Sequence, residues 1–149
     1  MPLITELKDK IDTQTTNLVL LTIATAGIYP ILWLNKSYPI IDNIAKTKTA
    51  DNVFIIWLAV CTGLSSLFFR INAAPMILLA MVLSIAANVL YIVWAFRAKK
   101  ALQEYALNEH KIDLRMNGFY TFLLSIYYIN YCINDLQEAE RKQKILSGQ

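Results

Sequence analysis

The sequence has 149 residues, of which 56% are hydrophobic and 17% are charged, and its formal net charge is +3. Soluble domains usually carry about 25% charged residues, so this composition argues against an ordinary soluble domain and favours one membrane domain over residues 1–149. The small positive charge forms no dense basic stripe, which argues against nucleic acid as a partner.

The first 17 residues are polar and of mixed charge. They lack a short apolar core followed by a small-residue cleavage site, so we expect no cleavable signal peptide. The first apolar segment, residues 18–34, is therefore expected to remain in the mature protein.

Segment 18–34 contains two residues that disturb a helix. Gly27 weakens helical backbone, and Pro30 removes a hydrogen bond and presses on the preceding turn, so we predict a kink or break. Tyr29 lies beside this break, and Trp33 is expected at the membrane interface. The break could bind ions, as in some transporters; we favour the alternative, in which Gly27 permits close helix packing.

The next two apolar segments, 53–69 and 76–96, are separated by only six residues and predict a helical hairpin. The 21 uncharged residues of 76–96 would form a helix about 30 Å long, the thickness of a bilayer's hydrocarbon core. Asn88 lies near its middle. A buried amide there would bond a hydroxyl of a neighbouring helix, for which Ser65, Ser66 or Ser125 are candidates, or else line a pore.

A basic cluster of Arg97, Lys99 and Lys100 follows this segment at once. Such a cluster is costly inside a bilayer, so it marks where the helix leaves the membrane, and we expect it in the cytoplasm. These side chains would contact anionic lipid headgroups or an acidic partner. Apolar residues continue at helical spacing, which predicts a cytoplasmic helix extension over 97–108. His110 is the single histidine and is expected to be solvated.

The fourth apolar segment, 118–134, is rich in tyrosine, and an exposed helix should follow it. Asn130 and Asn134 are four residues apart and should share a helix face; Asn134 is expected to cap the helix or meet headgroups. Cys61 and Cys132 lie inside apolar segments and are expected to be small buried hydrophobic residues without a disulfide.

Two membrane arrangements remain open. If all four segments cross, eight Lys and Arg residues lie on one side of the membrane and six on the other, so the charge distribution favours one orientation only weakly. If 18–34 and 118–134 only dip into the membrane, Arg70 alone faces the outside, which fits the positive-inside rule far better. Both segments are short and one is broken by Gly and Pro, which would permit dipping, but protein must then bury the irregular backbone, so we favour four crossings.

Three stretches carry a family resemblance: residues 25–34, which contain Gly27, Tyr29 and Trp33, the basic exit at 95–102, and the aromatic stretch 126–134, which ends in Asn134. Together they resemble domain-of-unknown-function family 4234, whose members are small multi-pass bacterial membrane proteins. Pro30 and Asn130 depart from the family pattern. The resemblance implies an inner-membrane location and no reaction.

These observations predict an all-α membrane bundle of four apolar segments around a central hairpin. No carboxylate lies within these segments, and no catalytic, cofactor or metal motif is visible. We therefore expect a non-enzymatic accessory, regulatory or protective (immunity-like) protein without a cofactor, acting through lipids and through a protein partner or its own oligomer. The alternative is a small oligomeric channel or solute pore lined by Asn88 and the Gly27–Pro30 break.

Overall fold

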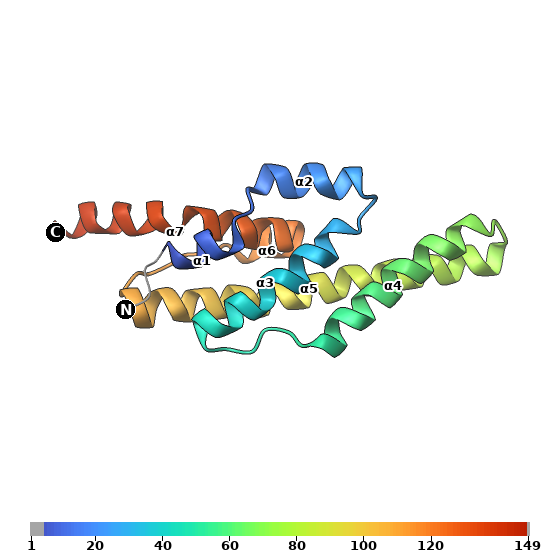
Figure 1. The fold of residues 1–149 in the computed structure, drawn as a ribbon, viewed down its shortest axis with the longest axis horizontal. Coiled ribbons are helices and arrows are strands. Elements are labelled where there is room, and N and C mark those ends of the chain that lie inside the picture. The colour runs from blue at the N-terminus through green and yellow to red at the C-terminus, as the bar shows by residue number, and fades with distance from the viewer. Residues whose placement is uncertain (1–4, 149) are drawn as a thin grey trace.

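The computed structural model describes residues 5–148, which are folded almost entirely into helices (Figure 1). In chain order the helices are α1 (Glu6–Ile11), α2 (Thr15–Ala24), α3 (Tyr29–Ala45), α4 (Asn52–Arg70), α5 (Ala74–His110), α6 (Gly118–Leu124) and α7 (Ile126–Ser147). The described range contains no strand, so the all-α prediction is confirmed.

Helices α4 and α5 form the long antiparallel hairpin that dominates the molecule. The Asp51 side chain caps α4 by accepting a 2.9 Å hydrogen bond from the Phe54 amide, and Pro75 lies in the first turn of α5. The 37 residues of α5 make a helix about 55 Å long. It continues through the basic cluster to His110, so half of it extends beyond α4 and packs on α3, α6 and α7.

Only α4 and α5, among the helices of residues 5–148, are long and apolar enough to cross a membrane. The expectation of four helical segments must be corrected, because segment 18–34 is two helices. Ala26 and Gly27 have positive φ values of 50° and 89°, and the chain turns back after α2 (Figure 1). The Lys36 ammonium then lies 3.3 Å from the Ile11 carbonyl oxygen, so the two ends of this excursion are neighbours. The break lies at Gly27, as the sequence predicts, but the chain reverses its direction there and is not merely kinked.

Segment 118–134 is also two helices, and it breaks at Ser125, where φ is 39° and ψ is −110°. The Tyr128 hydroxyl accepts a 2.9 Å hydrogen bond from the Asn117 amide. In one continuous helix these residues would be about 16 Å apart. Therefore α6 folds back onto α7. We call α2–α3 and α6–α7 the two fold-backs.

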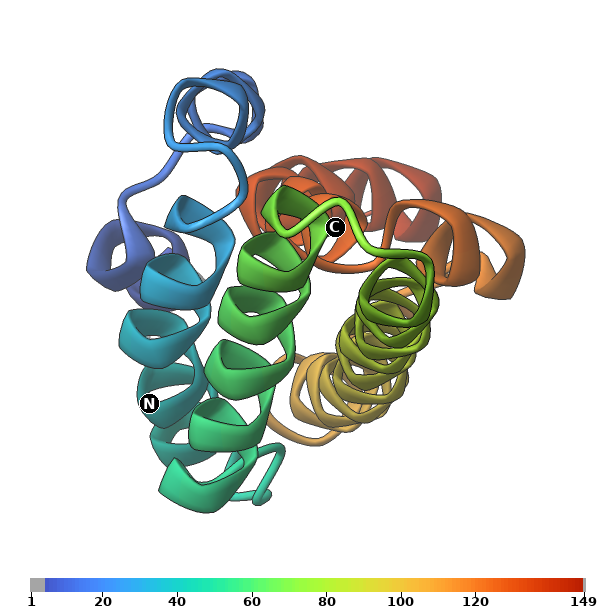
Figure 2. The same cartoon turned by 90° about the vertical axis from the view of Figure 1, so that its right-hand side faces the viewer.

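The core lies mainly where the fold-backs meet the second half of α5. Viewed along the hairpin, α3 lies beside α4, while α6 and α7 lie beside α5 (Figure 2). Trp33 and Trp94 pack edge to face with ring centroids 6.0 Å apart. Trp33 is only 2% exposed, so its ring is part of the protein core and does not face lipid headgroups.

Candidate functional site: a polar groove at the tips of the fold-backs

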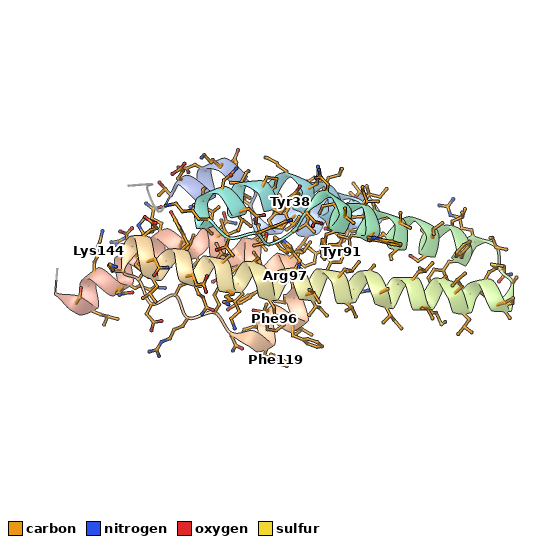
Figure 3. All side chains as sticks on the ribbon, turned by 90° about the horizontal axis from the view of Figure 1, so that it is seen from below. Tyr38, Tyr91, Phe96, Arg97, Phe119 and Lys144 are labelled. Carbon is orange, nitrogen blue, oxygen red and sulfur yellow. The ribbon has the colours of Figure 1, made fainter. Side chains whose placement is uncertain are left out.

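Apolar and charged surfaces are separated along the length of the molecule. Only 17% of the most apolar 18-residue stretch of α4, and 11% of that of α5, is buried. Arg70 is the only charged residue between Asp51 and Arg97, and the fold-backs carry no charge between Asp12 and Lys36 or between Arg115 and Asp135. Figure 3 shows polar side chains gathered on the half of the molecule that carries Lys144.

A polar groove of about 230 Å³ lies where the tips of both fold-backs meet the hairpin. It brings together Gly27 and Pro30 from the first break, Asn88 from α5 and Ser125 from the second break. The remaining lining residues are Thr22, Thr62, Ser65, Ser84, Ala87, Tyr91, Ile126 and Tyr127. Residues that the sequence singles out at separate places therefore share one site, which has the chemistry of hydroxyls and one amide.

Hydrogen bonds inside the helices use several of the donors of this groove. The Thr62 hydroxyl donates to the Leu58 carbonyl (2.8 Å) and the Ser65 hydroxyl donates to the Thr62 carbonyl (2.9 Å). The Asn88 amide nitrogen donates to the Ser84 carbonyl of its own helix at 2.9 Å. Asn88 is exposed and forms no bond to another helix within the described residues, so the prediction that it joins helices is wrong for this chain taken alone.

What remains toward the groove is a mixture of hydrogen-bond acceptors and free donors. Hydroxyl oxygens that have donated their proton keep their lone pairs, and so does the Asn88 amide oxygen. The Tyr91 hydroxyl, also in the lining, is buried and has no hydrogen-bond partner among residues 5–148. The groove is therefore suited to a group that both accepts and donates hydrogen bonds.

The two fold-backs are fastened to each other at two levels. Near the tips, the Tyr127 hydroxyl donates to the Thr22 hydroxyl at 3.1 Å. Farther from the tips, the side-chain amides of Asn130 and Asn134 each donate to the Thr13 carbonyl at 3.0 Å. The two asparagines share a face as predicted, but Asn134 contacts the α1–α2 linker, where we expected a cap or a headgroup contact.

Tyr29 lies at the start of α3, and its backbone amide donates a hydrogen bond to the Thr25 hydroxyl at 2.9 Å.

His110 is not simply solvated as expected. Its Nε2 lies 2.9 Å from the Tyr105 hydroxyl. Burial raises the pKa of the Tyr105 phenol, so this group remains protonated at neutral pH. Cys61 and Cys132 are buried free thiols.

The basic cluster lies at the level where α4 begins. Arg97 and Lys100 are exposed, and the Lys99 ammonium lies 5.9 Å from the centre of the Phe96 ring. The hydrogen bond from the Phe54 amide lowers the pKa of the Asp51 carboxyl, and the nearby charges of Lys48 and Arg97 lower it further. The charged residues nearest the apolar part of the hairpin, Asp51 before α4 and Arg97 on α5, therefore lie at the same level.

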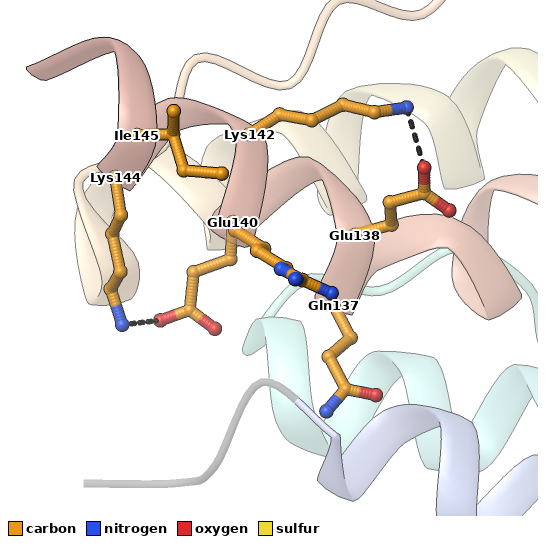
Figure 4. Close-up of a pocket in the computed structure, with 7 residues that line it drawn as sticks. Gln137, Glu138, Glu140, Lys142, Lys144 and Ile145 are labelled. Atoms are coloured by element: carbon orange, nitrogen blue, oxygen red, sulfur yellow. Dashed lines mark ion pairs between the residues drawn. The ribbon is translucent and has the colours of Figure 1, made fainter.

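A second, apolar groove of about 620 Å³ lies between α2, α6 and α7 and is lined by four tyrosines: Tyr120, Tyr127, Tyr128 and Tyr131. A third hollow lies on the exposed end of α7 (Figure 4). Its charges are paired along one helix, with Lys142–Glu138 and Lys144–Glu140 both at 2.8 Å. Such pairs support a solvated helix, and we do not assign a site there.

Across residues 5–148, no group of three or more His, Cys, Asp and Glu side chains is placed to hold a metal ion. Comparisons with protein-family models, with curated proteins and with solved structures find no match to this chain.

Proposed function

We propose that this chain is an integral protein of the bacterial inner membrane that acts by contact, as an accessory, regulatory or protective partner of a membrane system, and not as an enzyme. The observation that carries the proposal is the bare apolar surface of α4–α5, since soluble monomers rarely expose apolar patches of this extent. A core helix of a soluble protein would be mostly buried, and these helices are not.

Within the membrane, we infer that only α4–α5 crosses and that both fold-backs enter one leaflet. Charge returns nine residues after Gly27, at Lys36, and ten residues after Ser125, at Asp135. Arg97 likewise follows Asn88, which lies at the level of the tips, by nine residues. At 1.5 Å per residue these distances are about 14 Å, half of the roughly 30 Å core. The tips would then end at the bilayer midplane.

The charge distribution supports the same arrangement. With one crossing hairpin, every basic residue except Arg70 lies on one side of the membrane, which the positive-inside rule assigns to the cytoplasm. The irregular backbone at Gly27 and Ser125 then lines the groove beside the hairpin, which is the side on which irregular backbone in a membrane can be covered by protein. The family 4234 resemblance agrees with this location.

The polar groove suggests how contact is made. Uncompensated polar groups at the midplane are costly in lipid, so a partner helix or a second copy that forms hydrogen bonds with Asn88 would stabilise the assembly. Arg97 and Lys100 would add contacts to anionic headgroups. Among the described lining residues are hydroxyls and one amide, groups that do not titrate near neutral pH, which supports a binding role over acid–base catalysis.

A second candidate is an oligomeric pore, favoured by the convergence of Gly27, Pro30 and Asn88 on one groove. Two crossing helices cannot enclose a path, so a pore would require several copies. Purified protein in sealed liposomes distinguishes the two: a solute leak that Asn88→Leu abolishes supports the pore, and tight vesicles support contact alone.

The membrane proposal is tested by topology mapping. In a variant whose Cys61 and Cys132 are changed to Ala, single cysteines are placed at Arg70, Lys111 and Ser147 and labelled with an impermeant thiol reagent in intact and opened cells. We expect Arg70→Cys to label from outside, and both other positions only after opening. Four crossings would instead place Lys111 and Ser147 on opposite sides, and recovery of the protein in the aqueous fraction without detergent would refute the whole proposal.

A further inference from the structure

The inferred membrane placement, on which this inference depends, makes the protein very unequal in its two leaflets. At the level of the fold-backs, α3 packs against α4 and α5, α6 and α7 pack against α5, and α2 packs against α3 and α7. The tips reach only as far as Ser65 on α4 and Ser84 on α5, and beyond them the hairpin continues alone (Figure 1). One leaflet would therefore hold six helices and the other leaflet two.

The size of this difference follows from helix dimensions. A helix with its side chains is about 10 Å across, so four additional helices occupy roughly 300 Å² more in the cytoplasmic leaflet. This is several lipids' worth of area in one leaflet, with no counterpart in the other. A shape that is wide in one leaflet and narrow in the other is a wedge.

The outer sides of the fold-backs carry the side chains that such a wedge needs. On the first fold-back, Ile23 is 73% exposed and Ile28 is 59% exposed. On α6 of the second, Phe119 is 66%, Phe122 57% and Leu123 61% exposed. No charge lies on these helices between Asp12 and Lys36 or between Arg115 and Asp135. Exposed apolar side chains that penetrate to partial depth insert between acyl chains and respond to lipid packing and curvature.

We propose that the protein senses, and when abundant promotes, membrane curvature in which the cytoplasmic leaflet is convex. The recognised ligand is a lipid surface whose cytoplasmic leaflet is loosely packed, and the recognising surface is formed by the apolar outer faces of the two fold-backs. The α4–α5 hairpin anchors the protein and contributes almost equally to both leaflets.

The test uses full-length protein reconstituted into lipid vesicles of mixed diameter, which are then separated by size. Trypsin added outside cleaves the exposed tail at Arg141, Lys142 and Lys144 only when the charged end faces outward. In small vesicles the outer leaflet is convex, so we expect the cleavable fraction to exceed that in large vesicles severalfold. An equal fraction in both size classes overturns the inference.

Matched variants separate the wedge from the bulk of the charged end, which by itself favours the outside of a small vesicle. The triple variant Phe119→Ser, Phe122→Ser, Leu123→Ser weakens the wedge, and the control Ile145→Ser, Leu146→Ser removes equally exposed apolar side chains from the tail. We expect the triple variant to lose most of the size dependence and the control to keep it. Equal sorting of both variants overturns the inference.

Two further measurements make the outcome unambiguous. If the triple variant does not fold, as judged by its helical circular dichroism, Ile23→Ser with Ile28→Ser weakens the other fold-back and must reduce sorting in the same way. Flotation of vesicles after alkaline extraction measures insertion separately from sorting. Loss of insertion in the unmodified protein refutes the membrane proposal, whereas normal insertion with no sorting refutes only the wedge.

Discussion

The α4–α5 hairpin and the two fold-backs are built from similar material and fold differently. All are apolar and lack internal charges, yet 53–69 and 76–96 lie in unbroken helices while 18–34 and 118–134 turn back on themselves. The breaks lie near the middle of each fold-back segment, at Gly27 and Ser125. The length of uninterrupted helix, more than hydropathy, therefore separates a segment that can cross a bilayer from one that can reach only its middle.

The largest expected effect tests the hairpin as a membrane anchor. Ile85→Lys places a charge on the exposed face of α5 near its predicted membrane centre, at a cost of about 2.5–3.5 kcal/mol. We expect strong loss of protein from the membrane fraction. Leu107→Lys is the matched control, because Leu107 is equally apolar and exposed on the same helix but lies beyond Arg97. Similar losses for both variants would contradict the proposed boundary.

A smaller effect is expected where the fold-backs are tied together. Asn130 is fully buried and its amide donates to the Thr13 carbonyl and to the Thr15 hydroxyl. Asn130→Ala removes both hydrogen bonds, which costs about 1–3 kcal/mol, while the Thr13 carbonyl keeps its hydrogen bond from Asn134. Thermal unfolding in mild detergent measures this change. Asn108→Ala, at an exposed position on α5, is the control and should leave the midpoint unchanged.

Glycine substitutions compare a broken with an unbroken segment directly. Gly27 has a φ of 89°, so Gly27→Ala forces an L-residue into left-handed backbone and should destabilise by about 1–2 kcal/mol. Gly63 lies inside α4, and a methyl group added there meets no neighbour within 4 Å, so Gly63→Ala should stabilise by about 0.5–1 kcal/mol. If both substitutions shifted the unfolding midpoint in the same direction, the left-handed backbone at Gly27 would not be a fixed feature of the folded protein.

The smallest effect concerns the start of α4. The pKa of the Asp51 carboxyl is lowered in the folded state, so its capping contribution is present above the usual carboxyl range and is lost as pH falls through the lowered value. We expect the free energy of unfolding of the Asp51→Asn variant to fall slightly less between neutral and acidic pH than that of the unmodified protein. An unchanged pH profile, measured by thermal unfolding between neutral pH and about pH 3, would remove Asp51 from this role.

Part of this fold can be read from local sequence. The hairpin follows from two long uncharged runs and a six-residue connection, and the first break follows from Gly27 and Pro30. The reversal itself depends on tertiary contacts such as Lys36 with the Ile11 carbonyl, which no local pattern encodes. No local sequence pattern predicts the break at Ser125. The break accompanies a hydrogen bond between the Asn117 amide and the Tyr128 hydroxyl, which a local pattern does not encode.

The sequence brings the residues of the candidate site together only in the alternative of a pore lined by Asn88 and the Gly27–Pro30 break. Gly27, Pro30 and Asn88 are each unusual within apolar sequence, but their meeting at one groove requires the reversal of the first segment. Trp33 shows the opposite problem. Tryptophan has a general preference for membrane interfaces, and in this chain the preference is overridden by packing against Trp94.

The uninterrupted helix α5 has one more consequence. It carries Asn88 and the basic cluster on a single rigid element, 9 to 12 residues apart, and continues to His110. Because a helix resists bending and twisting, a molecule that grips the cytoplasmic end and rotates or tilts it must turn Asn88 with it. Under the proposed placement, turning the cytoplasmic end of α5 would therefore change what the protein presents in the middle of the bilayer.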